Sequence, residues 1–192
     1  MQGAAVSVTD LACRRGDRVL FRGLSLRLNA GEALHVTGSN GIGKSSMLRI
    51  VAGLAPAFAG TVEVAGPIGL LDERPALDPA LPLGRALGFW QRLDRATGNQ
   101  LKRLGLSELL DVPVRYLSTG QKKRAALARL IGQDALVWLL DEPLNGLDGH
   151  AVELLETLTA EHCASGGIAV IASHQPFQLP GMGGLALAEY QT

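Results

Sequence analysis

The chain contains the stretch Gly38-Ser39-Asn40-Gly41-Ile42-Gly43-Lys44-Ser45, which matches the phosphate-binding pattern G-x-x-x-x-G-K-[S/T] at every fixed position. A short strand is expected at Ala33–Thr37 before this loop, and a helical pattern over residues 44–52 follows it, which is the context that the motif requires. The glycines allow a tight turn that directs backbone N–H groups at one anion, and the amino end of the helix adds its positive dipole. We expect Lys44 to reach the β- and γ-phosphates of a nucleotide and the Ser45 hydroxyl to contact magnesium.

A second pattern is the apolar run Val137-Trp138-Leu139-Leu140, which ends in Asp141 and Glu142. A continuous apolar run is typical of a central parallel strand, and ligands of open α/β sheets bind at the carboxyl ends of such strands. Asp141 is therefore expected to hold magnesium through water, and Glu142 to polarise an attacking water as a general base. Alone, the two carboxylates could equally begin a loop or cap a helix; beside a phosphate loop, the catalytic interpretation is favoured.

Two further polar positions are ambiguous by themselves. The stretch Ser118-Thr119-Gly120-Gln121 precedes a helical pattern over residues 121–131, so its hydroxyl residues could simply cap that helix. His174 follows the strand pattern of residues 168–172 and could be an ordinary surface residue. In a sheet that carries a phosphate loop this position faces the terminal phosphate, so the functional interpretation of His174 is favoured.

The composition is that of a globular protein without a charge bias. The 192 residues are 47% hydrophobic and 19% charged, and 18 basic residues balance 18 acidic ones. We therefore expect one domain and no nucleic-acid partner. The basic run Lys122-Lys123-Arg124, with Arg129, is expected on the solvated face of a helix rather than in a nucleic-acid site.

Cysteine spacing and the lengths of the apolar runs indicate the redox compartment and whether the chain crosses a membrane. Cys13 and Cys163 have neither disulfide nor metal-site spacing, which favours a reduced compartment. We expect no signal peptide, and no apolar run approaches the roughly 20 residues that span a bilayer. If the protein acts at a membrane, another subunit is expected to span it.

The order of apolar patterns predicts an α/β fold. Strands are expected at residues 6–8, 24–28, 33–37, 61–64, 68–71, 135–140 and 168–172, and helices at residues 44–52, 121–131 and 149–161. Such alternation favours a mostly parallel sheet with helices packed on it. The segment of about residues 72–116 has a helical pattern, interrupted at residues 98–99 and 112–113, and is expected to be an insertion into one domain spanning residues 1–192.

In this order, the motifs resemble those of the ATP-binding cassette (ABC) family over essentially the whole chain. The phosphate loop resembles that family's Walker A motif, residues 117–121 its LSGGQ signature, and residues 139–142 its Walker B motif. Residues 145–148, which end in Asp148, resemble the D-loop, and His174 resembles the switch histidine. The resemblance implies a P-loop NTPase fold with a mostly parallel core, an antiparallel β subdomain and an inserted helical subdomain.

The same resemblance implies where ATP and Mg²⁺ bind. Catalytic roles would fall on Lys44, Glu142 and His174, and metal binding on Ser45 and Asp141. Nucleotide contacts are expected from Gly38, Ser39, Asn40, Gly41, Ile42, Gly43, Lys44, Ser45, Ser46 and Arg15. In this family two subunits dimerise head to tail, so each chain would complete its partner's ATP site with Ser118, Thr119, Gly120 and Gln121. ATP binding would hold the two halves together, and hydrolysis would release them.

A narrower resemblance is to the ATPase subunits of the cytochrome c biogenesis (Ccm) heme export systems. It rests on Leu11-Ala12-Cys13, Leu20-Phe21, Gly38-Ser39-Asn40-Gly41 and Ser173-His174-Gln175-Pro176. That resemblance implies ATP hydrolysis linked to heme export and to the release of a heme-loaded chaperone. It also implies a homodimer of ATPase subunits bound to integral membrane subunits, peripheral to the cytoplasmic face of the bacterial inner membrane.

Three positions depart from the family pattern. Arg74 stands where the family has the Q-loop glutamine, and arginine offers no oxygen to magnesium. Either Asp72 or Glu73 takes over this role, or metal binding and coupling to the membrane subunit are altered. Arg15 replaces the aromatic residue that stacks on adenine, although a guanidinium plane can also stack on a base. Thr119 replaces a glycine of the signature. These departures leave open an alternative, a regulatory subunit of another ABC complex with weak or no ATPase activity.

Overall fold

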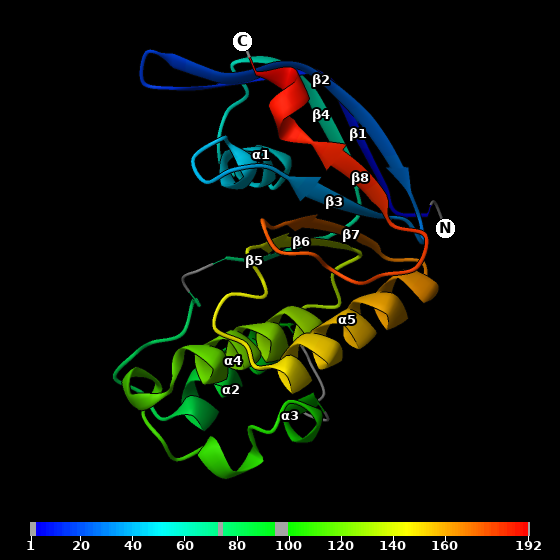
Figure 1. The fold of residues 1–192 in the computed structure, drawn as a ribbon. Coiled ribbons are helices and arrows are strands. Elements are labelled where there is room, and N and C mark those ends of the chain that lie inside the picture. Colours follow the sequence, from blue (N-terminus) through cyan, green and yellow to red (C-terminus); the bar gives the residue numbers. More distant parts are fainter. Residues whose placement is uncertain (1–2, 73–74, 95–99, 192) are drawn as a thin grey trace.

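The computed structural model describes residues 3–72, 75–94 and 100–191, and the strands within these ranges form two sheets (Figure 1). The antiparallel sheet has the order β2-β1-β4 and contains β1 (Ala5–Arg15), β2 (Arg18–Asn29) and β4 (Ala59–Ala65). The parallel sheet has the order β5-β6-β7-β3-β8 and contains β3 (Ala33–Thr37), β5 (Ile68–Leu71), β6 (Val137–Asp141), β7 (Ile168–Ala172) and β8 (Gly183–Ala186). Strands β6, β7 and β3 therefore form the middle of the parallel sheet.

Helices cover the parallel sheet on both faces. Helix α1 (Lys44–Val51) lies between the two sheets, whereas α4 (Thr119–Gly132) and α5 (Gly149–Ala164) lie on the opposite face (Figure 1). Helices α2 (Leu83–Asp94) and α3 (Gln100–Arg103) contact α4. Short 3-10 helices are found at Ser107–Leu109, Val114–Tyr116 and Leu187–Tyr190. None of the described helices is long and apolar enough to cross a lipid bilayer.

Strand β6 shows how one apolar run serves two cores. Val137 and Leu139 belong to the core formed with α1 and the antiparallel sheet, while Trp138 and Leu140 belong to the core that includes α4 and α5. Every residue of β6 is buried, as the continuous apolar pattern predicts for a central parallel strand. The parallel sheet thus lies between two apolar layers.

The register of the central strands fixes the edge at which the predicted site residues gather. Ala172 of β7 pairs with Val36 of β3 on one side and with Asp141 of β6 on the other. The N–H of Glu142 donates to the Ala172 carbonyl oxygen at 2.8 Å, and the N–H of Ser173 donates to the Val36 carbonyl oxygen at 3.2 Å. The loops that follow β3, β6 and β7 consequently leave the sheet side by side.

The amino-terminal hairpin is longer than the sequence pattern predicts. Strands β1 and β2 span 11 and 12 residues, whereas apolar alternation predicts strands only at residues 6–8 and 24–28. The pairing register shifts between Val8 and Leu11 and again on either side of Cys13. Such bulges break the two-residue period of side chains, so apolar alternation does not predict the rest of the hairpin.

Other helix and strand boundaries differ from those predicted from the sequence, each for a local reason. Helix α4 begins at Thr119 rather than at residue 121, because Ser118 caps it. The sequence pattern does not predict β8, since two of its four residues are glycines. The helical character expected after residue 83 is present in α2 and α3. The expected interruption at residues 98–99 lies outside the described residues, and the limits of the insertion, about residues 72–116, stay a prediction.

Leu139 is fully buried in the middle of β6, so its truncation tests how far this strand supports the fold. We expect Leu139→Ala to lower the free energy of unfolding by about 3 kcal/mol, because it removes apolar contacts and leaves a cavity. Denaturant unfolding of the isolated protein measures this change. The matched control is Leu93→Ala, at a position 65% exposed on α2, where we expect a change below about 0.5 kcal/mol. Equal losses in the two variants would contradict this assignment of the core.

Candidate functional site

The glycine-rich loop after β3 wraps around the ammonium group of Lys44. Lys44 is the first residue of α1, and its Nζ donates to the carbonyl oxygens of Gly38 at 2.7 Å and Ser39 at 3.4 Å. Gly43 precedes the helix with a φ of 120°, and a Cβ there would lie 3.1 Å from the ring of Phe21. The positive φ therefore favours glycine, and a larger residue would also crowd the Phe21 ring. The loop holds the ammonium at the amino end of α1, where the helix dipole favours an anion.

Ser45 and Asp141 lie together, as the magnesium hypothesis requires. The Ser45 hydroxyl donates to Asp141 Oδ1 at 2.9 Å and so joins the start of α1 to the end of β6. Magnesium is commonly held by one or two carboxylates together with water and substrate phosphates. Among the described residues, no group of three or more His, Cys, Asp or Glu side chains could hold a metal ion on its own. The hydroxyl and the carboxylate therefore fit a cation that is shared with a bound phosphate.

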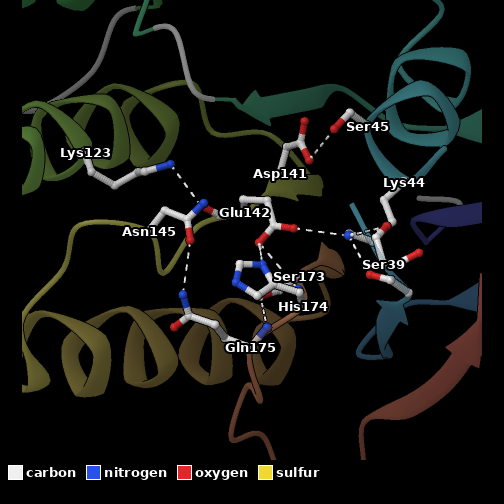
Figure 2. A network of polar contacts seen from close by, with 11 residues as sticks. Ser39, Lys44, Ser45, Lys123, Asp141, Glu142, Asn145, Ser173, His174 and Gln175 are labelled. Atoms are coloured by element: carbon white, nitrogen blue, oxygen red, sulfur yellow. Dashed lines mark hydrogen bonds and ion pairs between the residues drawn. The ribbon is translucent and has the colours of Figure 1, made fainter. Parts of the chain in front are cut away.

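Glu142 connects the phosphate loop to the loop after β7 (Figure 2). Its Oε1 lies 3.2 Å from Lys44 Nζ, and its Oε2 lies 2.8 Å from His174 Nδ1. The backbone N–H of His174 also donates to Oε2, at 3.4 Å. Lys44 and Glu142 are buried, whereas His174 is exposed. Groups from three different loops thus meet at one carboxylate, which is the arrangement expected of a general base and the residues that orient it.

The surroundings of Glu142 favour its ionised form. Burial by itself raises the pKa of this carboxyl, but hydrogen bonds from His174 and Lys44 and the positive charge of Lys44 outweigh burial and hold the pKa below the ordinary glutamate value. An ionised carboxylate can accept a proton from water, as a general base must.

The backbone of Glu142 adopts a left-handed conformation that is uncommon for residues other than glycine. Its φ is 43°, a conformation that costs of order 1–3 kcal/mol and persists only where the surroundings hold it. Its N–H donates to Ala172, and its carbonyl oxygen accepts the N–H of Asn145 at 3.3 Å and the Nζ of Lys123 at 3.1 Å. Gln175 Nε2 in turn donates to Asn145 Oδ1 at 3.1 Å (Figure 2). Hydrogen bonds therefore fix both polar groups of the Glu142 backbone.

The basic run of α4 does not lie on a solvated face, contrary to the sequence-based expectation. Lys123 is buried, and Lys122, Arg124 and Arg129 are partly buried. The side chains of Lys122, Lys123 and Arg124 each donate to a backbone carbonyl, at 3.4, 3.1 and 3.1 Å respectively. The guanidinium of Arg129 lies 3.7 Å from the centroid of the Trp90 ring. No motif in the sequence indicates the contact of Lys123, because its acceptor is the backbone of a residue 19 positions away.

A cavity of about 280 Å³ brings many of the predicted nucleotide residues together. It is lined by Arg15, Leu20, Asn40, Gly41, Gly43, Lys44, Ser45, Ser46, Glu142, Asn145 and His174. Arg15 is exposed at the end of β1, so stacking of its guanidinium on a base stays a prediction. Ile42 is buried in the core with α1, and its predicted contact with the nucleotide stays a prediction. Glu73 and Arg74, the departures expected at the Q-loop, lie outside the described residues.

The signature residues 118–121 lie at the amino end of α4 and are not among the described residues that line this cavity. Ser118 Oγ accepts the N–H of Gln121 at 3.2 Å, and Gln121 Oε1 accepts the N–H of Ser118 at 2.8 Å. This capping box confirms the N-cap interpretation that the sequence left open. Ser118 and Thr119 are exposed at the helix end, and their role in a partner's site stays a prediction.

The loop at residues 145–148, predicted to be the D-loop, packs against the signature of the same chain. A Cβ placed on Gly120 would lie 2.8 Å from the Gly146 carbonyl oxygen, and a Cβ on Gly146 would lie 2.8 Å from Thr119 Cγ2. Asp148 ends this loop as the N-cap of α5, where its Oδ1 accepts a backbone N–H at 2.8 Å. A catalytic role for Asp148 stays a prediction, because the observed contact is that of a helix cap.

The region that contains these loops matches a known protein family. Residues 21–145, from the antiparallel sheet through the loop after β6, match the family model described as ABC transporter. The chain belongs to the ABC transporter family. The family predicted from the order of the sequence motifs is therefore confirmed, and with it the binding of ATP.

Relatives of this ABC protein cover its full length. The cytochrome c biogenesis ATP-binding export protein CcmA of Novosphingobium aromaticivorans is 59% identical over 191 residues, which cover 100% of both chains. The protein of the same name from Zymomonas mobilis is 46% identical over 192 residues, which cover 98% of this chain and 83% of that one.

Solved structures of ABC proteins share the fold. An ABC transporter ATP-binding protein from Pyrococcus furiosus has a TM-score of 0.82 at 21% identity and covers 98% of this chain and 100% of that one. The cbiO1 protein of Clostridium perfringens, part of the ABC transporter complex cbiONQ, has a TM-score of 0.73 at 26% identity, with 91% of this chain and 80% of that one covered. The α/β ABC ATPase fold predicted from the sequence is confirmed, whereas the roles of individual site residues remain predictions.

The lowered pKa of Glu142 has a consequence for stability. Because folding favours the ionised carboxylate, its stabilising contribution is complete above the pKa of the unfolded chain and is lost as the pH falls through the lower pKa of the folded protein. We expect the difference in free energy of unfolding between the wild type and Glu142→Gln to narrow as the pH drops below about 4.3. Denaturant unfolding over a pH series measures this difference in free energy. Glu63→Gln, on the exposed face of β4, controls for the loss of one negative charge. A difference that does not vary with pH would contradict the assignment.

Proposed function

We propose that this ABC protein is the ATP-hydrolysing subunit of an exporter that serves c-type cytochrome biogenesis. The observation that carries the proposal is the carboxylate of Glu142, held between Lys44 and His174 beside the Ser45–Asp141 pair. Relatives named cytochrome c biogenesis ATP-binding export protein match the chain from end to end and support the narrower assignment. ATP hydrolysis would be linked to heme export and to the release of a heme-loaded chaperone.

Each side chain has a distinct task in this proposal. Ser45 and Asp141 would hold Mg²⁺, which supplies positive charge against the phosphates when it is bound. Lys44 shares its ammonium between the phosphate loop and Glu142 Oε1, so a triphosphate in the loop would draw the ammonium to itself. Oε1 would then be available to a water, while His174 keeps Oε2 in place. Glu142 would accept the proton of that water as it attacks the terminal phosphate.

The position of the signature supports a head-to-tail homodimer. The amino end of α4 is exposed and lies outside the cavity that contains Lys44. The Ser118 hydroxyl caps the N–H of Gln121, whereas the N–H groups before it, in the first turn, have no acceptor within an α-helix. Such a helix end favours an anion, which in a dimer would be the terminal phosphate held by the partner. We further propose that integral membrane subunits of a heme-export type bind this dimer at the cytoplasmic face of the bacterial inner membrane.

The role of Glu142 can be tested by Glu142→Gln, which removes the general base and keeps the shape of the site. We expect phosphate release to fall by a factor of about 100 or more, while ATP still binds and holds the dimer for longer. Phosphate release is measured on protein co-expressed with its membrane subunits, with Lys44→Ala as the inactive reference. Unchanged turnover in Glu142→Gln would refute the assigned role. Wild-type turnover no higher than that of Lys44→Ala would favour a regulatory subunit instead.

Sites shared between two chains predict complementation between two inactive variants. Ser118→Arg places a bulky side chain at the signature, and Lys44→Ala removes the phosphate-binding ammonium, so each variant alone is expected to retain less than about a tenth of the activity. In a mixed dimer, Lys44 of one chain faces the intact Ser118 of the other and completes one site. Phosphate release by an equal mixture should rise above that of either variant alone, to at most about a quarter of the wild-type rate, since half of the dimers carry one complete site. Full activity of Ser118→Arg alone would contradict the shared site.

A further inference from the structure

Lys123 is a buried cation to which the ATP site described above assigns no role. It lies on α4, and its side chain reaches across to the loop after β6, where Nζ donates to the Glu142 carbonyl oxygen at 3.1 Å (Figure 2). The residue is only 8% exposed. Burial of an ammonium group is costly unless it is hydrogen-bonded, so its contact with Glu142 is a substantial constraint on both groups.

The acceptor of this hydrogen bond belongs to the residue whose backbone needs support. Glu142 has a φ of 43°, and the direction of its side chain depends on that conformation. Its N–H is held by β7, and its carboxylate by Lys44 and His174. Its carbonyl oxygen accepts the N–H of Asn145 at 3.3 Å from its own loop, and helix α4 adds the Nζ of Lys123 at 3.1 Å. Loss of the Lys123 contact would leave this oxygen with the longer bond from Asn145, so the peptide group would be freer to rotate and to turn the carboxylate away from its partners.

The same helix carries the signature. Lys123 follows Thr119 by four residues, which is about one helical turn, so both side chains lie on one face of α4. In the preceding turn, Thr119 and Gly120 pack closely on Gly146. The first two turns of α4 therefore contact the loop after β6 at two points, Glu142 and Gly146. A displacement of the amino end of α4 would move both.

We infer that Lys123 is a positioning residue that couples the amino end of α4 to the catalytic conformation of Glu142. This inference rests on the proposed function, in which the amino end of α4 meets the terminal phosphate held by the partner. Lys123 then links each chain's signature to its own general base. Occupancy of the partner's site would in this way set the geometry of hydrolysis in the first site.

The test is Lys123→Met, which keeps the unbranched chain up to the ε position and removes the ammonium donor. We expect kcat for ATP hydrolysis to fall by a factor of about 10 or more, because displacement of a general base by a fraction of an ångström disrupts its alignment. The KM for ATP and the ATP-driven dimerisation should stay within about twofold of the wild type, since Lys123 does not line the ATP cavity. Lys123→Arg, which retains a charged donor, should recover most of the lost kcat.

The matched control is Lys122→Met, the neighbouring residue, whose Nζ donates to Arg115 rather than to Glu142. Its kcat is expected to stay within about twofold of the wild type, as for a substitution away from the reacting groups. A wild-type kcat in Lys123→Met, or an equal loss in Lys122→Met, would overturn the inference. So would a rise in KM that matches the loss of kcat, because a general structural defect would affect nucleotide binding as well.

Two further measurements keep the outcomes distinct. If Lys123→Met shows no cooperative unfolding transition, Lys123→Gln takes its place, and the same loss of kcat without a change in KM is expected. Lys44→Ala and Glu142→Gln are measured in the same assay. If these two variants match the wild type, the proposed ATPase function fails; if they are inactive and Lys123→Met is not impaired, only the positioning role of Lys123 fails.

Discussion

The alignment of three parallel strands at Ala172 is the constraint on which the site depends. Ala172 pairs with Val36 and Asp141, and it accepts the N–H of Glu142. The phosphate loop, Glu142 and His174 all lie within a few residues of these paired positions. A shift of one residue in any of the strands would turn alternate side chains to the other face of the sheet. The geometry of the site is therefore fixed first by the backbone and only then by its polar contacts.

Lys44 and Glu142 depend on one another within this frame. Both are buried, and they lie 3.2 Å apart. Removal of one partner of a buried ion pair leaves an uncompensated charge and is strongly unfavourable, although the intact pair contributes little net stability. The hydrogen bonds from Lys44 to Gly38 and Ser39 and from His174 to Glu142 satisfy the remaining polar atoms. The pair is thus better understood as a device that fixes the positions of charge than as a source of stability.

The parts of the structure that the sequence predicts are those whose cause is local. The phosphate loop follows from the glycines and the lysine, and β6 follows from a continuous apolar run that both cores bury. The full length of the β1–β2 hairpin could not be predicted, because bulges near Leu11 and Cys13 remove its periodicity. The contact of Lys123 could not be predicted either, because its ammonium binds a backbone carbonyl far along the chain and no residue spacing in the sequence indicates such a bond. His174 was predicted from its place after a strand and Arg15 from the family resemblance, and both line the cavity.

The division of the interior into two layers has a consequence for how such proteins diversify. The nucleotide loop and α1 belong to one layer, and α2, α4 and α5 belong to the other. Helix α2 of the second layer carries none of the predicted site residues, so it can be lengthened, shortened or replaced while the packing beneath the nucleotide is preserved. A chain with this architecture can therefore adapt to new membrane subunits as a modular part, provided that the contacts at the sheet edge are retained.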